Sequence, residues 1–200
     1  MKNNFPHVFS PLTIRGMTLK NRVVMMPMGS DFAGHDGELS DEHIKYYELR
    51  ARGGTGLIMV ENVCVKYPEG SNGTTQLRLD KDCYIPRLFT LTEACHRQGA
   101  LMGIQINHAG ASAMSSRIGM QPVSASRFPS LSKEEITSIA KDYGTAAKRA
   151  VNAGFDVVEI HAGHSYLISQ FLSPTTNDRT DEFGGSAENR ARFCRMVIDE

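Results

Sequence analysis

Three times along this chain, a predicted helix is followed by glycine and then by a short apolar run, and few folds are compatible with that order. The glycines are Gly53–Gly54, Gly99 and Gly154. Each stands where a helix can end in a left-handed residue, a conformation that glycine adopts without steric cost. The apolar runs are typical of strands covered on both sides in a parallel sheet. The repeat therefore predicts an α/β fold.

The predicted elements begin with a hairpin and continue as strands and helices separated by long loops. Ser40, Ser132 and Ser186 are placed to cap three of the helices. Ser132 and Glu135 form a capping box. We expect a hairpin of 12–15 and 17–20, buried strands at 23–26, 56–60, 100–106 and 156–160, and helices at 41–52, 85–97, 133–153 and from 187 toward residue 200.

Four βα units with long loops after the strands indicate either an open doubly wound sheet or a TIM-type β/α barrel. The polar loops favour the barrel, and no Gly-x-Gly-x-x-Gly motif follows the first strand. A complete barrel needs eight units and typically about 250 residues. We therefore expect residues 1–200 to be the N-terminal part of a single barrel domain, without a second domain. The chain is then a fragment, or copies associate as a homo-oligomer to cover the open edges.

Composition argues against several classes of protein. Lys and Arg number 22, as do Asp and Glu, so the charge carries no basic footprint for nucleic acid. The four cysteines have no close-spaced pair, which favours reduced thiols in a cytosol over zinc or disulfides. The N-terminal segment Met1–His7 lacks an apolar signal core, and no apolar run approaches the roughly 18 residues of a membrane span. We expect a cytoplasmic protein without membrane or nucleic-acid partners.

Polar side chains gather where the fourth strand ends, at His161, His164 and Tyr166. Strand alternation puts Glu159 on the same face as His161, and active sites of α/β proteins usually lie at such strand ends. Three interpretations stay open. The histidines and Glu159 could bind a metal, although further ligands are lacking. The two imidazoles could instead donate hydrogen bonds to one carbonyl oxygen, with Tyr166 supplying a proton. They could also be unrelated polar residues.

The ends of the first and third strands add further candidates. Gln105 and Asn107 share one face, and the Gln105 amide could hydrogen-bond a planar heterocycle or be a satisfied buried amide. His108, just past the strand, is interpreted as structural. The segment Pro27–Gly29 exposes backbone groups with little bulk, which suits a flat ligand, although on composition alone a plain loop start is the better explanation.

As a set, these motifs resemble the old yellow enzyme family of FMN-dependent ene reductases. The similarity runs from about Phe9 to Glu200, and the segment Gln105–Gly110 resembles the enoate and 2,4-dienoyl-CoA reductase branch. The motifs that carry the resemblance, in chain order, are 9–12, 20–28, 54–61, 105–110, 161–167 and 171–190.

The resemblance implies a TIM barrel with FMN at its strand ends and no metal site. Its reaction passes hydride from NADH or NADPH, via the flavin, to the C=C of an α,β-unsaturated carbonyl compound. By position, Pro27, Met28, Gly29, Asn62 and Gln105 match flavin-binding residues, His161 and His164 match the pair that grips the substrate carbonyl, and Tyr166 matches a catalytic tyrosine of the same loop.

Two departures from the family pattern leave redox tuning and substrate choice open. Gly29 stands where many relatives carry Cys or Thr, and Asp31 where one branch has Tyr. The family's phosphate site, and the iron–sulfur cluster of some relatives, would lie beyond Glu200. We therefore expect this chain alone to bind FMN weakly or not at all. A metal-dependent barrel hydrolase or aldolase and a non-catalytic half barrel remain as alternative functions.

Overall fold

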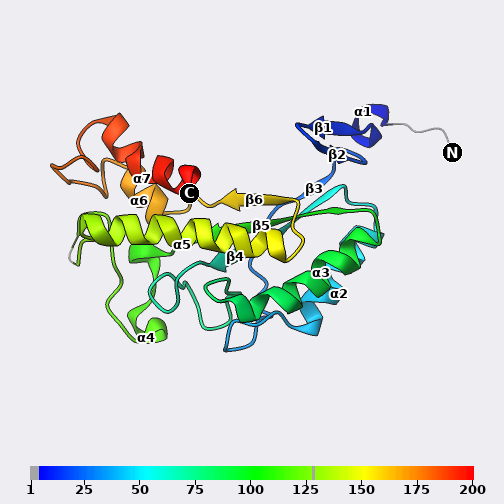
Figure 1. The fold of residues 1–200 in the computed structure, drawn as a ribbon, viewed down its shortest axis with the longest axis horizontal. Helices are drawn as coiled ribbons and strands as arrows, with labels where there is room; N and C mark the ends of the chain where they lie inside the picture. The colour runs from blue at the N-terminus through cyan, green and yellow to red at the C-terminus, as the bar shows by residue number, and fades with distance from the viewer. Residues whose placement is uncertain (1–4, 128) are drawn as a thin grey trace.

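The computed structural model describes residues 5–127 and 129–200, and its centre is a parallel four-stranded sheet (Figure 1). Each strand pairs with its neighbours in the sequence, in the order β3-β4-β5-β6. The predicted α/β class with a parallel sheet is confirmed. Of the segment expected to lack a signal core, residues 1–4 lie outside the described residues. The strands are β3 Val24–Met25, β4 Leu57–Cys64, β5 Leu101–Asn107 and β6 Val157–Ile160.

The four long helices occur where the sequence predicts them. Ser40, Ser132 and Ser186 each accept a hydrogen bond from the backbone N–H three residues on, so all three predicted N-caps are confirmed. Shorter helices and turns fill segments predicted as loop. The long helices are α2 Asp41–Arg52, α3 Ile85–His96, α5 Lys133–Asn152 and α7 Ala187–Asp199; the short ones are α1 Pro6–Phe9, α4 Ser115–Ile118 and α6 Leu167–Leu172, with 3-10 turns η1 Asp82–Tyr84 and η2 Gly110–Ser112.

The glycines that follow the helices behave largely as predicted. Gly54, Gly99 and Gly154 have φ values of 102°, 74° and 81°, in the region that glycine favours. Gly53 was expected to share this role but is right-handed, with φ of −68°. The N–H of Gly53 still bonds inside the helix, to Leu49 O. The single left-handed residue that ends α2 is therefore Gly54.

One face of the parallel sheet packs against helices and forms the main core. Alternate residues of the central strands, such as Ile58 and Ile104, are fully buried there. They belong to one apolar cluster with side chains of α2, α3 and α5, including Tyr47, Leu91 and Ile139. The helices α2 and α3 lie next to each other, and α5 runs alongside the strands (Figure 1). This face fixes the strands that carry the site.

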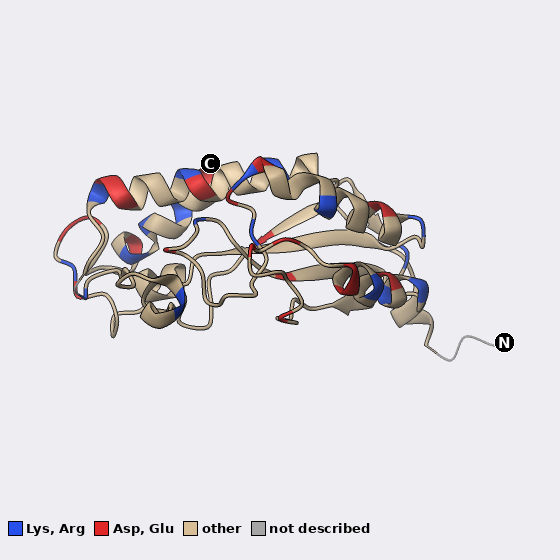
Figure 2. Cartoon of the chain, turned by 90° about the horizontal axis from the view of Figure 1, so that it is seen from below, with Lys and Arg blue, Asp and Glu red and all other residues tan. Residues whose placement is uncertain are grey.

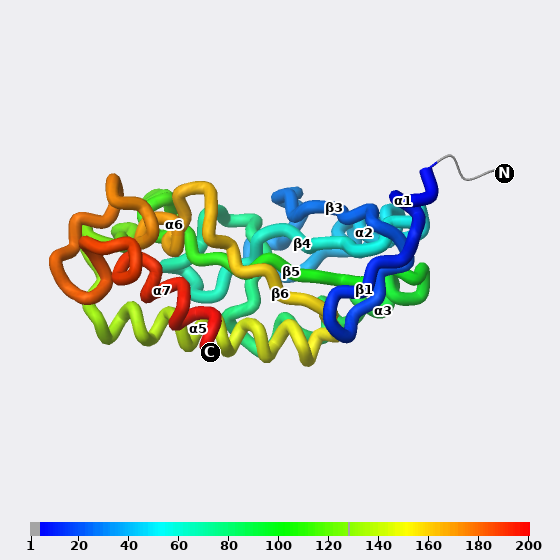
Figure 3. Tube along the Cα trace, turned by 90° about the horizontal axis from the view of Figure 1, so that it is seen from above, coloured from blue at the N-terminus to red at the C-terminus, as the bar shows by residue number. Residues whose placement is uncertain are grey.

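The opposite face is covered by the N-terminal hairpin only where the strands begin. Strands β1 Leu12–Ile14 and β2 Met17–Leu19 pair antiparallel, as predicted. Leu19 packs with Leu57 and Met59 in a small second cluster. The hairpin lies at the opposite end of the molecule from α6 and α7 (Figure 3). The strand ends on this face are therefore left open for polar side chains.

Three predictions about the strands are wrong. The first strand was expected to be buried, but β3 is a short edge strand, and Val24 and Met26 are 39% and 63% exposed. The other edge, β6, is only half-buried. The second strand was expected to end at Val60 but continues to Cys64, because a bulge between Val60 and Asn62 lets the pairing with β5 resume.

Candidate active site

A hollow of about 600 Å³ opens at the carboxyl ends of the four strands. All the predicted site residues except Tyr166 line it, so Gln105 and the two histidines share one side of the sheet. Its size is in the range of small-molecule sites, roughly 300–1,000 Å³. The lining consists of Met26, Pro27, Met28, Gly29, Asn62, Gln105, Glu159, Ile160, His161, Ala162 and His164.

A row of polar side chains crosses the floor of the hollow from β4 to β6. Asn62, Gln105 and Glu159 are neighbours in the strand register. The Gln105 amide Nε2 donates to Glu159 Oε1 at 2.5 Å, and Asn62 Oδ1 accepts from Gln76 Nε2 at 2.7 Å. The Gln105 Oε1 atom is not used in these bonds and can accept a further hydrogen bond. Sequence analysis did not single out Gln76, which lies in the segment after β4.

The two histidines contact each other at the rim. His164 Nδ1 lies 3.2 Å from His161 Nε2, and their ring centroids are 5.0 Å apart. The N–H of Gly163 donates to His161 Nδ1 at 3.3 Å. Because Nδ1 accepts, the proton of a neutral His161 is on Nε2, and this N–H points to His164 Nδ1. The backbone thus fixes the tautomer that can donate to a ligand oxygen.

Burial keeps His161 neutral. Loss of hydration lowers its pKa below the ordinary value of 6.5, and His164 beside it acts in the same direction. Glu159 opposes the shift more weakly. A neutral imidazole with its proton on Nε2 is a hydrogen-bond donor that adds no positive charge to the hollow.

Tyr166 lies beside the histidines but outside the lining of the hollow. Its ring centroid is 5.0 Å from that of His161, and its hydroxyl accepts a hydrogen bond from Asn72 Nδ2 at 2.8 Å. The ring packs against a small apolar cluster that includes Ala109 and Ile118. Asn72 was not predicted, because it lies 94 positions from Tyr166 and carries no local motif.

The other residues singled out on β5 are enclosed. Asn107 is fully buried and is not part of the lining. His108 is also fully buried, with Nε2 3.3 Å from Glu69 Oε1 and Nδ1 accepting from the Gly110 N–H at 3.1 Å. These contacts agree with a structural His108.

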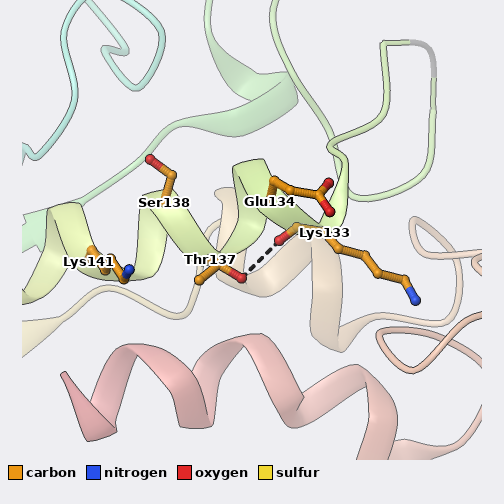
Figure 4. Close-up of a pocket in the computed structure, with 5 residues that line it drawn as sticks. All are labelled: Lys133, Glu134, Thr137, Ser138 and Lys141. Atoms are coloured by element: carbon orange, nitrogen blue, oxygen red, sulfur yellow. Dashed lines mark hydrogen bonds between the residues drawn. The ribbon is translucent and has the colours of Figure 1, made fainter.

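The other surface features are weaker candidates for a functional site. A hollow on the first turns of α5 is lined by one helix only and contains none of the predicted residues (Figure 4). Basic and acidic residues are interspersed along the helices and loops of the cartoon (Figure 2). In the described part of the chain, no group of three or more His, Cys, Asp and Glu side chains could hold a metal ion. None of the helices described combines the length and apolarity that crossing a bilayer requires.

Comparison with known proteins identifies the family of this chain. The NADH:flavin oxidoreductase / NADH oxidase family matches residues 7–200. The chain belongs to this family. It is 46% identical to an NADH oxidase of Thermoanaerobacter brockii and 45% identical to an NADPH dehydrogenase of Bacillus subtilis (strain 168). These matches cover 98% and 96% of this chain but 32% and 59% of the two relatives.

Solved structures of the family have the same fold. An old yellow enzyme homologue from Zymomonas mobilis superposes with a TM-score of 0.90 at 32% identity, over 97% of this chain and 59% of that protein. Morphinone reductase superposes with a TM-score of 0.89 at 31% identity, over 98% and 59%. The resemblance to the old yellow enzyme family is therefore confirmed, and the four βα units correspond to part of its TIM barrel.

Proposed function

We propose that this chain carries the flavin-facing and carbonyl-facing residues of an FMN-dependent ene reductase. The substrate would be an α,β-unsaturated carbonyl compound and the reductant NADH or NADPH. One observation carries the proposal: Gln105 and the pair His161 and His164 line the same hollow, together with Pro27–Gly29. The hollow thus contains an amide that could hydrogen-bond a flavin ring and two imidazoles that could donate to a carbonyl oxygen.

The lining suits a planar, hydrogen-bonding ring such as the flavin of FMN. Asn62 and Gln105 offer amide groups, and Pro27–Gly29 offers a low wall with exposed backbone. A Cβ added at Gly29 would meet no atom within 4 Å, so the space over this wall is open. FMN, when bound, would supply the transfer of hydride between the nicotinamide and the C=C. Asn62, Gln105 and Pro27–Gly29 are the residues that would hold it.

The histidines would bind the substrate oxygen. The Nε2–H of His161 would turn from His164 to the carbonyl, and His164 would donate from its own ring nitrogen. Two donors at this oxygen stabilise the negative charge that develops there when hydride adds to the β-carbon. Tyr166, next to His161, would then supply the proton that the α-carbon takes up.

The relatives support this activity. The family description names NADH and a flavin, one relative is an NADPH dehydrogenase, and morphinone reductase has been solved in complex with tetrahydroNAD. The chain spans 32% and 59% of its curated relatives, so the activity is a proposal for the whole protein. That residues 1–200 belong to a single barrel domain likewise stays a prediction.

Anaerobic turnover tests the proposed reaction. Protein loaded with FMN is given NADPH or NADH with 2-cyclohexen-1-one, and the saturated ketone is measured. We expect reductant consumption to match ketone formation. Equal reductant oxidation with and without the enone, and no saturated product, would show that ene reduction is wrong.

The affinity of this chain for FMN is a separate matter. None of the side chains that line the hollow is Lys or Arg, so the described lining offers no cation to the FMN phosphate. We therefore expect the isolated 200-residue chain to bind FMN weakly. Absorbance of the purified chain decides this, because a stoichiometric yellow protein would contradict weak binding.

Self-association is supported by the exposed sheet edges. Both β3 and β6 have an unpaired side in the described structure, and unpaired edges favour pairing with another chain. We infer that copies of this chain associate through them, and sedimentation velocity should then give a dimer.

The four cysteines are free, which supports a reducing compartment such as the cytoplasm.

A further inference from the structure

The turn between β6 and α6 holds an unfavourable backbone conformation at two successive residues. His164 and Ser165 have φ values of 53° and 59°, and neither is glycine. Side chains with a Cβ are strained in this left-handed region. Such a conformation persists only where the surroundings hold it. The turn carries His164 at its start and Tyr166 at its end, so whatever holds it also places these two side chains.

The Gln170 side chain is the group that meets this requirement. It is 5% exposed and lies on α6, one turn after the strained pair. Its Nε2 donates to Ser165 O at 2.6 Å and to Ala109 O at 3.3 Å, and its Oε1 accepts from the Ala111 N–H at 3.1 Å. Both ends of the amide are therefore used, and they join the loop after β5 to the loop after β6.

Neighbouring residues leave room for the Gln170 amide and add a hydrogen bond to the carbonyl that it holds. A Cβ at Gly110 would lie 2.6 Å from Gln170 Oε1, so glycine leaves the room that the side chain needs. The hydroxyl of Ser112 gives Ser165 O a second hydrogen bond, at 2.7 Å. The Ser165 carbonyl is thus held from two sides, by a buried amide and by an exposed hydroxyl.

We infer that Gln170 is a positioning residue that keeps the His164–Ser165 turn left-handed and so sets the contact between His161 and His164. Gln170 does not line the hollow itself. Its effect on catalysis rests on the proposed function, because the histidines must both reach one carbonyl oxygen. The effect of Gln170 on the contact between the two histidine rings does not rest on the proposed function, and this effect can be measured without flavin.

Rescue by glycine is the decisive test. Gln170→Met keeps the length of the side chain but removes both ends of the amide, so the turn should relax and His164 should leave His161. Adding Ser165→Gly should restore the pair, because glycine accepts positive φ without strain. The matched control is Gln170→Met with Ala162→Gly, which adds glycine at a residue of the same loop whose φ is not positive.

The readout is the ring ¹⁵N spectrum of the seven histidines in the labelled chain, assigned with His161→Gln and His164→Gln. We expect the Nε2–H signature of His161 bonded to His164 in the native chain, its loss in Gln170→Met, and its return with Ser165→Gly but not with Ala162→Gly. In flavin-loaded protein, the kcat/KM for the enone should fall on the order of tenfold and return in the same variants.

Several outcomes would overturn the inference. The signature could persist in Gln170→Met, or Ala162→Gly could restore it as well as Ser165→Gly does. If Gln170→Met does not fold, Gln170→Glu decides instead, because it keeps an acceptor for the Ala111 N–H and replaces only the Nε2 donor to Ser165 O. It should weaken the signature, and an unchanged spectrum overturns the inference. A protein with the expected spectra but no ene reductase activity would contradict the proposed function and leave the role of Gln170 standing.

Discussion

Ile104 and Gln105 are adjacent residues of β5, yet the two faces on which they lie have opposite properties. Ile104 is fully buried in the apolar cluster formed with the helices. Gln105 lines the open hollow and donates to Glu159. One face is closed by apolar packing, and the other places hydrogen-bonding groups at the ends of parallel strands.

Within a single strand, residues on the helix face should therefore contribute mainly to stability, and residues on the hollow face mainly to binding and catalysis. On the helix face, removal of a side chain leaves a cavity, because the neighbours are packed at crystal-like density. On the hollow face, Gln105 bonds to Glu159 and His161 lies against His164, so these polar groups have other residues of the lining as partners. Substitutions there should therefore change binding and rate more than folding. Substitutions on the two faces of β5 and at the rim of the hollow test this separation.

Truncation on the helix face should have the largest effect on stability. We expect Ile104→Ala to lower the free energy of unfolding by about 2–5 kcal/mol, and Ile104→Val by about 0.5–1.5 kcal/mol. Urea unfolding followed by circular dichroism measures both. A loss below about 1 kcal/mol for Ile104→Ala would mean that this face does not carry the fold.

Removal of the His164 ring, which we propose binds the substrate carbonyl, should have a large effect on the rate and little effect on stability. His164→Ala deletes one of two donors, and loss of such a donor typically lowers kcat by about 100- to 1,000-fold. The midpoint of thermal unfolding should change little, because His164 is exposed at the rim. His35→Ala, at an exposed histidine outside the hollow, is the control for both measurements. A similar loss of rate in both variants would contradict the role of His164.

Acid should destabilise the protein through its buried histidines. Burial lowers the pKa of His161 and of His108 below 6.5, so the unfolded chain binds these protons more tightly. Above pH 6.5 the two histidines are neutral in both the folded and the unfolded chain, and no stability is lost. As the pH falls through 6.5 toward the lowered values, each histidine should cost about 1.4 kcal/mol per pH unit. Urea unfolding between pH 7.5 and 5.5 measures the slope, and His161→Gln should make it shallower.

Local signals account for the parts of the molecule that sequence analysis predicted well. The caps at Ser40, Ser132 and Ser186 and the glycines at 54, 99 and 154 act within a few residues, so their effects can be read from short motifs. The polar residues at the strand ends converge because parallel strands end at the same edge of a sheet. Their roles in binding and catalysis stay predictions.

Long-range contacts account for what was missed. The segment Glu61–Asn62 looks like the start of a loop, but Glu61 is buried because Tyr47 OH and the Ser30 N–H donate to its carboxylate. The apolar residues of β3 look like a buried strand, but an edge position leaves them exposed. Asn72 and Gln170 bond to residues whose identity no local pattern reveals.

The smallest effect on stability should come from a substitution at Gln105, the residue next to Ile104. Gln105→Leu removes the donor to Glu159 and leaves a half-buried carboxylate without that partner, which should cost about 1 kcal/mol in unfolding free energy. The same change should weaken FMN binding by about tenfold, because one hydrogen bond to the ring is lost. Glu159→Leu in the Gln105→Leu background should recover part of the stability and none of the FMN affinity. If Gln105→Leu instead destabilised the chain as much as Ile104→Ala, the two faces of β5 would not divide folding from chemistry.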